Sequence, residues 1–290
     1  MVSYIMLSIR AFLFVLCLVT GVHSWAQKDH RRTSEGPGDL IEKARNLSLQ
    51  KDRTQATNIL VSAMRREPAN STAFREMRVA LEEISMVFFN DRAQQLYELA
   101  LSLRKTDPKQ AQSRLQEASR IEPDNLQVLN ELARLQMIAN NCDNAAESLA
   151  QIRKTNPFDE QTLLGSAQAA VCQNDWPLYT TLRSQAEGRK GSYKKSWLSL
   201  EVERADREKS ESRAIDAVQA LKGADPEHPE LGYWEWRYGE VSEQKNAAGA
   251  RYLMTCKNLS TALLRRYLSE PFLCRKTVDV ENAQKAGGSL

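Results

Sequence analysis

Proline recurs along this chain at a fixed spacing. Pro157 follows Pro123 after one period, and Pro226 follows Pro157 after close to two such periods. Proline cannot continue a helix, and it disfavours helix in the residue before it, so each of these prolines ends a helical stretch. Self-similarity at a period of about 34 residues predicts a helical solenoid, in which similar units stack one after another.

Small residues recur inside the same repeats. With each proline counted as position 32, alanine occupies position 8 or 20 in several repeats, as at Ala56, Ala111 and Ala145. Small side chains let two antiparallel helices approach closely, and larger apolar residues at positions 4, 7, 11 and 24 fill the seam between them. One helix pair cannot bury its apolar face alone, so neighbouring pairs must stack. The predicted repeats span 37–70, 92–125, 126–159, 160–193, 195–228 and 229–262.

One stretch does not fit the period. The interval from Pro68 to Pro123 exceeds one period by more than half a period. The excess predicts one long extra helix near 71–89 and leaves the order of the helices open around this junction. An irregular all-helical domain without true repeats is the alternative interpretation.

These residues resemble the tetratricopeptide repeat family, whose pattern is a helix–turn–helix of the same length. The resemblance covers 37–262 and is most specific over 92–159, where two consecutive repeats keep their phase without a gap. The chain departs from the pattern because most of its repeats lack the large aromatic residue of the first helix. The resemblance implies an all-α fold, a right-handed solenoid of about 13–14 helices. It would occupy 40–278, with a C-terminal cap at 263–278.

The resemblance also implies a partner surface. In this family the first helix of each repeat lines a concave groove, at positions 2, 5, 9 and 12 of the repeat. The corresponding residues here are Gln127, Asn130, Arg134, Met137, Gln161, Leu164, Gln168 and Val171. Their mixture of polar and apolar side chains suits an extended peptide better than a small metabolite. The Lys/Asn/Arg set with which some family members clamp a C-terminal carboxylate is not present in phase, and an ordinary solvated inner face is the alternative.

The leading functional hypothesis is a non-enzymatic exported scaffold that binds a protein or an extended peptide on its concave face. A second hypothesis is a structural subunit of an envelope machine, for outer-membrane assembly, secretion, pilus formation or cell-wall synthesis, which would use its ends or its convex face. A third is a sugar-binding or enzymatic solenoid.

Signatures of catalysis and of nucleic-acid binding are missing from the sequence. Beyond residue 26 the histidines are His30 and His228, and no HExxH, P-loop, GxGxxG or GxSxG motif occurs. The chain has 40 basic and 37 acidic residues, well mixed, and no basic stripe of the kind that nucleic acid requires. The sequence therefore predicts no enzyme, no cofactor, no metal site and no nucleic-acid partner.

The N-terminus has the features of a secretory signal. Arg10 precedes an apolar run from Ala11 to Val22, which is short for a membrane-spanning helix. Ser24 and Ala26 are small residues at the −3 and −1 positions of a cleavage site. We therefore predict a signal peptide at 1–26, export to a bacterial periplasm, and no stable membrane insertion after cleavage. Secretion, or an uncleaved membrane anchor, is the alternative.

Both flanks of the repeat region are poor in apolar residues. The stretch 27–39 is rich in charged, Ser, Gly and Pro residues, which predicts a flexible leader. The stretch 279–290 has few apolar residues and a Gly-Gly pair, which predicts a disordered tail.

The cysteines fit an exported protein. Once Cys17 leaves with the signal peptide, four cysteines remain, and an even number in an exported chain suggests disulfides. The repeat register places Cys142 at the start of one helix and Cys172 at the end of its antiparallel neighbour, so these two should pair. Cys256 and Cys274 would then form a second disulfide, which joins the end of the array to its C-terminal cap. Free buried thiols are the alternative, and the absence of CxxC spacing argues against metal binding.

Aromatic residues are densest between Tyr233 and Tyr238. Helical spacing places Trp234 and Tyr238 on one face with Leu231, which predicts packing into the last repeat. Trp236 and Tyr233 lie off that face and form a candidate docking patch.

Overall fold

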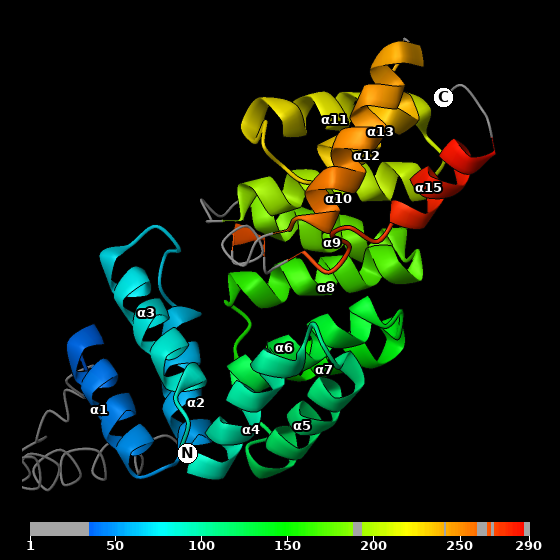
Figure 1. The fold of residues 1–290 in the computed structure, drawn as a ribbon. Helices are drawn as coiled ribbons and strands as arrows, with labels where there is room; N and C mark the ends of the chain where they lie inside the picture. The colour runs from blue at the N-terminus through cyan, green and yellow to red at the C-terminus, as the bar shows by residue number, and fades with distance from the viewer. Residues whose placement is uncertain (1–34, 188–192, 241, 260–265, 268–269, 287–290) are drawn as a thin grey trace, which may run out of the picture.

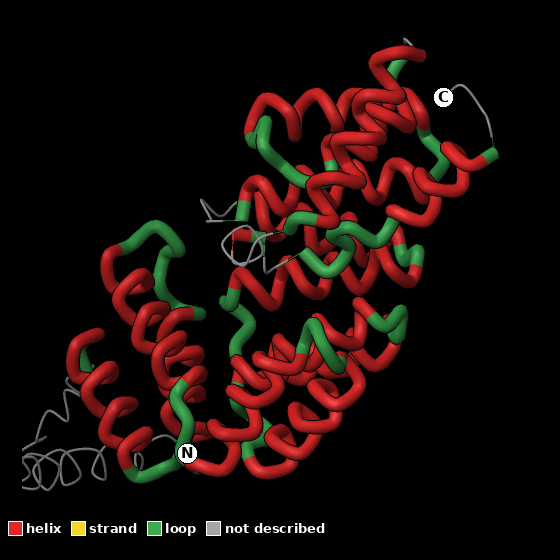
Figure 2. Tube along the Cα trace, in the orientation of Figure 1, coloured by secondary structure: helices red, strands yellow, loops and turns green. Residues whose placement is uncertain are grey.

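The computed structural model describes residues 35–187, 193–240, 242–259, 266–267 and 270–286. Over these residues the chain consists of helices, turns and loops, without a strand (Figure 2). The signal peptide predicted at 1–26, and the leader up to residue 34, lie outside the described residues.

Fourteen helices are described, and consecutive helices pack as antiparallel pairs that stack into an α-solenoid (Figure 1). The helices of the first half are α1 (Pro37–Leu49), α2 (Arg53–Met64), α3 (Thr72–Met86), α4 (Asp91–Leu103), α5 (Pro108–Ile121), α6 (Leu126–Ile138) and α7 (Cys142–Thr155). Those of the second half are α8 (Glu160–Gln173), α9 (Trp176–Glu187), α10 (Lys194–Arg207), α11 (Glu211–Ala224), α12 (Leu231–Tyr238), α13 (Ser242–Lys257) and α15 (Thr277–Lys285).

Local sequence fixes many of the helix starts. The side chains of Asp52, Ser71, Asp107 and Asp159 each accept a hydrogen bond from a backbone N–H of the first helical turn. Such caps satisfy donors that have no partner inside the helix. These helices therefore begin at short polar residues, both in the turns inside a repeat and in the turns between repeats.

Each predicted repeat span matches one helix pair, although α4 and α10 begin one residue before their spans, and α3 lies within the span 71–89 that was expected to hold an extra helix. The repeated alanines lie where the helices of a pair approach each other, and they are fully buried. These residues are Ala44, Ala56, Ala111, Ala133, Ala145 and Ala214. A larger side chain at such a position would force the two helices apart.

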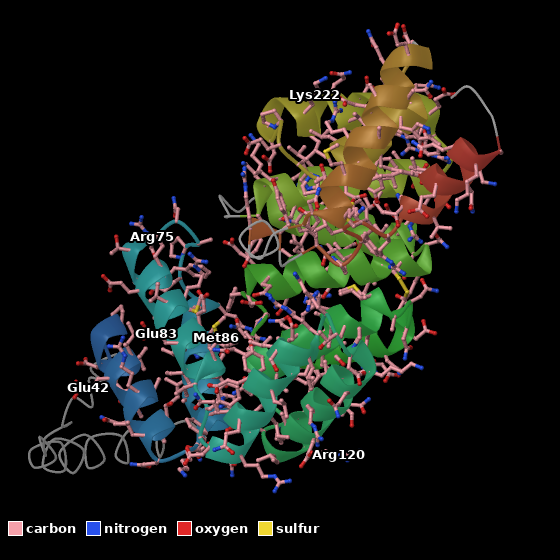
Figure 3. All side chains as sticks on the ribbon, viewed as in Figure 1. Glu42, Arg75, Glu83, Met86, Arg120 and Lys222 are labelled. Carbon is pink, nitrogen blue, oxygen red and sulfur yellow. A yellow bond between two sulfur atoms is a disulfide. The ribbon has the colours of Figure 1, made fainter. Side chains whose placement is uncertain are left out.

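Helix α3 folds back onto the array. It packs against α1, α2 and α6, and Met86 at its end joins the core between α6 and α7 (Figure 3). The rings of Phe74 and Phe158, which lies in the α7–α8 turn, pack edge to face with their centroids 5.3 Å apart. Arg78 forms an ion pair with Glu160 at the start of α8, at 3.3 Å. The first three helices thus form a unit that covers the N-terminal ends of α6 and α8.

A buried arginine joins this unit to the later repeats. Arg53, at the start of α2, is 2% exposed. Its guanidinium donates to Glu122 Oε2 at 2.8 Å, to Asp124 of the same turn, and to the backbone carbonyls of Ile84 and Val87. One side chain therefore links the start of α2, the end of α3 and the α5–α6 turn.

The C-terminal residues return to contact helices that lie much earlier in the chain. Residues 270–276, which we call the C-terminal strap, contact α6, α8, α10 and α12 and lead into α15. The disordered tail predicted for 279–290 is wrong up to Lys285, because α15 packs on α13 and buries Val280 completely. A single valine facing the core is enough to anchor a helical turn, and composition alone does not reveal it. None of the helices within the described ranges combines the length and the apolar character that a bilayer crossing needs.

Candidate functional site

The five polar groove positions divide into exposed and buried residues. Gln127, Arg134 and Gln161 keep part of their surface exposed. Asn130 is only 9% exposed and Gln168 only 4%. A binding role for all five stays a prediction, but Asn130 and Gln168 are not surface positions in this structure.

Asn130 and Gln168 are buried because segments of the same chain cover the groove. Asn130 lies beside the start of α8, where its Oδ1 accepts a hydrogen bond from Thr162 Oγ1 at 3.3 Å. In α8 every residue from Thr162 to Cys172 is buried, although this is the first helix of its repeat. The strap lies against this helix, with Phe272 packed into the core formed by α8, α9 and α10. Sequence periodicity could not reveal the cover that the strap gives to α8, since the strap lies outside the repeats.

The first residue of the strap is held by a buried histidine. The Nε2 atom of His228 lies 2.9 Å from a carboxylate oxygen of Glu270, and Ser199 Oγ donates to the same oxygen at 2.9 Å. Burial by itself lowers the pKa of His228, but the hydrogen bond and the charge of Glu270 outweigh it and raise the pKa above its ordinary value. The raised pKa favours the imidazolium, which strengthens the attraction to Glu270.

The other end of the strap is held by two buried carboxylates. The backbone N–H of Cys274 donates to Glu230 Oε1 at 2.5 Å, and Lys276 Nζ donates to Glu203 Oε2 at 2.5 Å. The Lys276 ammonium also lies 3.6 Å from the centre of the Trp234 ring. Burial raises the pKa of Glu230 to about 7. The strap is therefore attached at both ends by charged or polar contacts, and Phe272 between them packs into an apolar core.

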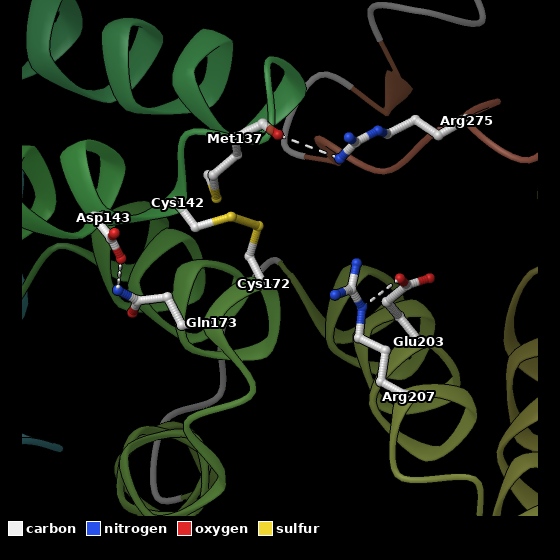
Figure 4. The surroundings of a disulfide bond; sticks show 8 residues. All are labelled: Met137, Cys142, Asp143, Cys172, Gln173, Glu203, Arg207 and Arg275. Carbon is white, nitrogen blue, oxygen red and sulfur yellow. Dashed lines mark hydrogen bonds and ion pairs between the residues drawn. A yellow bond between two sulfur atoms is a disulfide. The ribbon is translucent and has the colours of Figure 1, made fainter.

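The structure joins the four cysteines in the two pairs that the repeat register predicts. The Cα atoms of Cys142 and Cys172 are 5.9 Å apart, and those of Cys256 and Cys274 are 5.6 Å apart, both within the range that a disulfide spans. The first pair links the start of α7 to the end of α8 (Figure 4). The second pair links the end of α13 to the strap.

A pocket of about 170 Å³ lies between the ends of α4 and α6 and the strap. Its apolar walls come from Ile138, Leu259, Pro271 and Leu273. Four basic residues also line it, together with Tyr267 and Glu270: Arg104, Lys105, Arg134 and Arg275. The pocket contains Arg134, one of the groove residues expected from the sequence, and so places it beside three cations that sequence reasoning missed.

The four cations of the pocket differ in their partners. Arg134 forms a two-pronged ion pair with Glu131, with Nε 2.9 Å from Oε2. Arg275 donates from Nη1 to the carbonyl oxygen of Met137 at 3.2 Å (Figure 4). Arg104 and Lys105 form no ion pair with any described residue. Arg275 comes together with Arg104 and Lys105 only through the tertiary fold. One indication in the sequence that the strap folds back onto the array was the predicted pairing of Cys274 with Cys256.

The aromatic cluster is mostly core. Tyr233 is 3% exposed, and its ring packs against Trp234 and Tyr252, so it is not available as part of a docking patch. Trp236 is partly exposed and packs against Tyr233 at 5.4 Å. A docking role for Trp236 stays a prediction.

Comparison with known proteins places part of this architecture in a family. Residues 102–170, which run from the end of α4 into α8, match the model of the tetratricopeptide repeat. A crystal structure of a tetratricopeptide repeat protein from Parabacteroides merdae ATCC 43184 is similar at 16% sequence identity and a TM-score of 0.39, covering 87% of this chain and 93% of that chain. No curated protein sequence matches this chain. Residues 102–170 are therefore similar to tetratricopeptide repeats, and they lie within a longer all-helical stack of antiparallel helix pairs.

Proposed function

We propose that this chain is a non-enzymatic exported scaffold that holds a protein or an extended peptide on its concave face. Tetratricopeptide repeat arrays serve in general as scaffolds for protein–protein interaction. The observation that carries the proposal is the pocket beside Arg134, in which apolar walls and cations converge where the ends of α4 and α6 meet the strap. Binding sites typically combine an apolar lining with a few convergent polar groups.

Two features support export, most simply to a bacterial periplasm. The first 26 residues of the sequence have the pattern of a cleaved signal peptide. Two cysteine pairs lie at bonding distance, and disulfides persist in oxidising compartments. The proposed scaffold therefore works outside the reducing cytosol.

Site-specific photo-crosslinking in the native cell tests the binding face. A crosslinking amino acid replaces Gln127 or Gln161 on the concave face in the full-length chain, or Gln116 on the exposed side of α5 as the matched control. We expect one discrete protein partner to be trapped from Gln127 and Gln161 and none from Gln116. A partner trapped only from Gln116 would overturn the assignment of the concave face.

A hollow on α1, the first described helix, favours one alternative function. A hollow of about 350 Å³ lies along α1, lined by Glu42 and Leu47, and Leu49 nearby is 83% exposed (Figure 3 labels Glu42). A structural subunit of an envelope machine would use such a surface. Crosslinking from Glu42 to a stoichiometric envelope complex, with no product from Gln127, would favour this alternative.

A further inference from the structure

We propose that the pocket between α4, α6 and the strap binds an acidic stretch of an extended polypeptide and takes one of its apolar side chains between Ile138 and Leu273. This inference rests on the proposed function and adds the chemical class of the partner. It follows from the charge, the size and the construction of the pocket.

The charge of the pocket is strongly positive, whereas the chain as a whole is nearly balanced, with 40 basic and 37 acidic residues. Of the two acidic groups nearby, Glu131 is engaged by Arg134 and Glu270 by His228. Arg104 and Lys105 are left without a carboxylate among the described residues. An incoming carboxylate would supply the missing counter-charge and form charge-assisted hydrogen bonds.

Arg275 adds a second reason for an anionic ligand. Partial burial lowers the pKa of its guanidinium, and nearby Arg207 acts in the same direction, while Glu203 opposes them. The Arg275 guanidinium donates to the carbonyl oxygen of Met137, and it carries further N–H donors that can bind a carboxylate. Because Arg275 lies beside Met137 of α6, the carboxylate would bind on the side of the pocket that is nearest α6.

The size of the pocket favours one side chain over a whole metabolite. Its volume of about 170 Å³ is below the range of about 300–1,000 Å³ that is usual for small-molecule sites. Ile138 is 36% exposed at its wall, and burying an apolar side chain against it would remove water from both. Binding of single-stranded nucleic acid uses aromatic platforms for the bases, and the one aromatic residue of this pocket, Tyr267, is 4% exposed.

The strap side of the pocket is anchored at Cys274 and Arg275 before any ligand arrives. The disulfide between Cys256 and Cys274 ties the strap to α13, and the bond from Arg275 to Met137 ties it to α6. A wall that is already ordered costs little conformational entropy on binding. The strap is therefore part of the binding site as well as a cover for α8.

The test uses a fluorescent peptide, acetylated and amidated, in which one Leu is flanked by two Glu on each side. Its affinity for the full mature chain is measured by fluorescence anisotropy. The double variant Arg104→Gln/Lys105→Gln should weaken binding at least about tenfold, because charged contacts of this kind are lost. The matched control Arg65→Gln/Arg66→Gln removes the same charge from exposed residues outside the pocket and should change affinity less than about twofold.

Two further comparisons separate the parts of the inference. Replacing the Leu of the probe by Gly should weaken binding about tenfold, since the apolar contact is lost. Removing the disulfide with Cys256→Ser/Cys274→Ser should also weaken binding, whereas Cys142→Ser/Cys172→Ser, which removes the other disulfide, should leave it nearly unchanged.

Several outcomes would overturn the inference. The first is that the acidic probe does not bind, and the second is that the two charge variants lose the same amount of affinity for it. The third is that vesicles of anionic phosphatidylglycerol bind as tightly as the probe, which would indicate a membrane surface instead. If crosslinking from Gln127 still traps a protein partner while the acidic probe does not bind, the proposed function stands and this inference fails. If neither experiment gives a product, both fail.

Discussion

At the scale of single residues, two groups beneath the strap bind protons more tightly in the folded chain than in the unfolded chain. Burial raises the pKa of Glu230 from 4.5 to about 7, and Glu270 raises the pKa of His228 above 6.5 against the effect of burial. Linkage then makes stability fall as pH rises. The stabilisation that Glu230 contributes is lost as pH rises from 4.5 to about 7. For His228 the stabilisation is complete below pH 6.5 and is lost as pH rises through its folded pKa.

We predict that Glu230→Gln flattens this dependence. The amide cannot ionise, and its oxygen can still accept the hydrogen bond from Cys274. The urea midpoint of the wild type should fall relative to that of the variant as pH rises from 4.5 to about 7. Glu227→Gln is the matched control, because the Glu227 side chain is 77% exposed. Parallel pH profiles for the wild type and Glu230→Gln would contradict the prediction.

At the scale of elements, the junction around Arg53 holds the first three helices to the rest of the array. Burial by itself raises the pKa of Glu122, but hydrogen bonds from Arg53, Asn125 and two backbone N–H groups outweigh it and lower the pKa. Glu122 is therefore a buried anion whose main counter-charge is one side chain of α2.

We predict that Arg53→Met destabilises the protein by about 3–5 kcal/mol, since it leaves Glu122 buried and unpaired. Adding Glu122→Gln should recover part of the loss, because the uncompensated charge disappears. Urea denaturation followed by circular dichroism gives the free energies of unfolding. Arg45→Met is the matched control: it breaks an ion pair with Glu83 whose side chains are both 57% exposed, and it should cost less than about 1 kcal/mol. Equal losses in the two variants would show that the Arg53 network is not special.

A second prediction at this scale concerns the disulfide between α7 and α8. Cys142→Ser/Cys172→Ser should cost about 2–4 kcal/mol, because the closed loop restricts the unfolded chain. In a solenoid the loss should be local, so hydrogen exchange should rise most in α8 and α9. Peptide mapping without reductant on protein from its native compartment should find Cys142 joined to Cys172 and Cys256 joined to Cys274. Crossed pairs or four free thiols would contradict it.

The sequence-based prediction was most successful where structure is periodic. The stacked pairs depend on contacts between helices that are neighbours in the sequence. The spacing of Pro123, Pro157 and the buried alanines was therefore enough to predict them. The strap and α15 depend on contacts between residues far apart, such as Arg275 with Met137, separated by 138 residues. No local pattern records such contacts. For the same reason Asn130 and Gln168 were expected in an open groove, whereas Arg134 kept part of its predicted exposure.

At the scale of the whole molecule, export predicts a specific start of the mature chain. Signal cleavage after Ala26 should leave Gln27 as the first residue, and N-terminal sequencing of exported protein measures it directly. Intact Met1 on a membrane-bound product would indicate an uncleaved anchor.

The strap also determines how the molecule would carry mechanical load. In an ordinary helical array a pull on the last helix peels the repeats away one at a time. Here α15, the last described helix, follows a segment that is bonded to α13 through Cys256 and Cys274 and held to α6 through Arg275. Tension applied at the C-terminus would therefore be shared among helices from α6 to α13. The part of the array from α6 onward should therefore resist stretching as one block and yield in a single step.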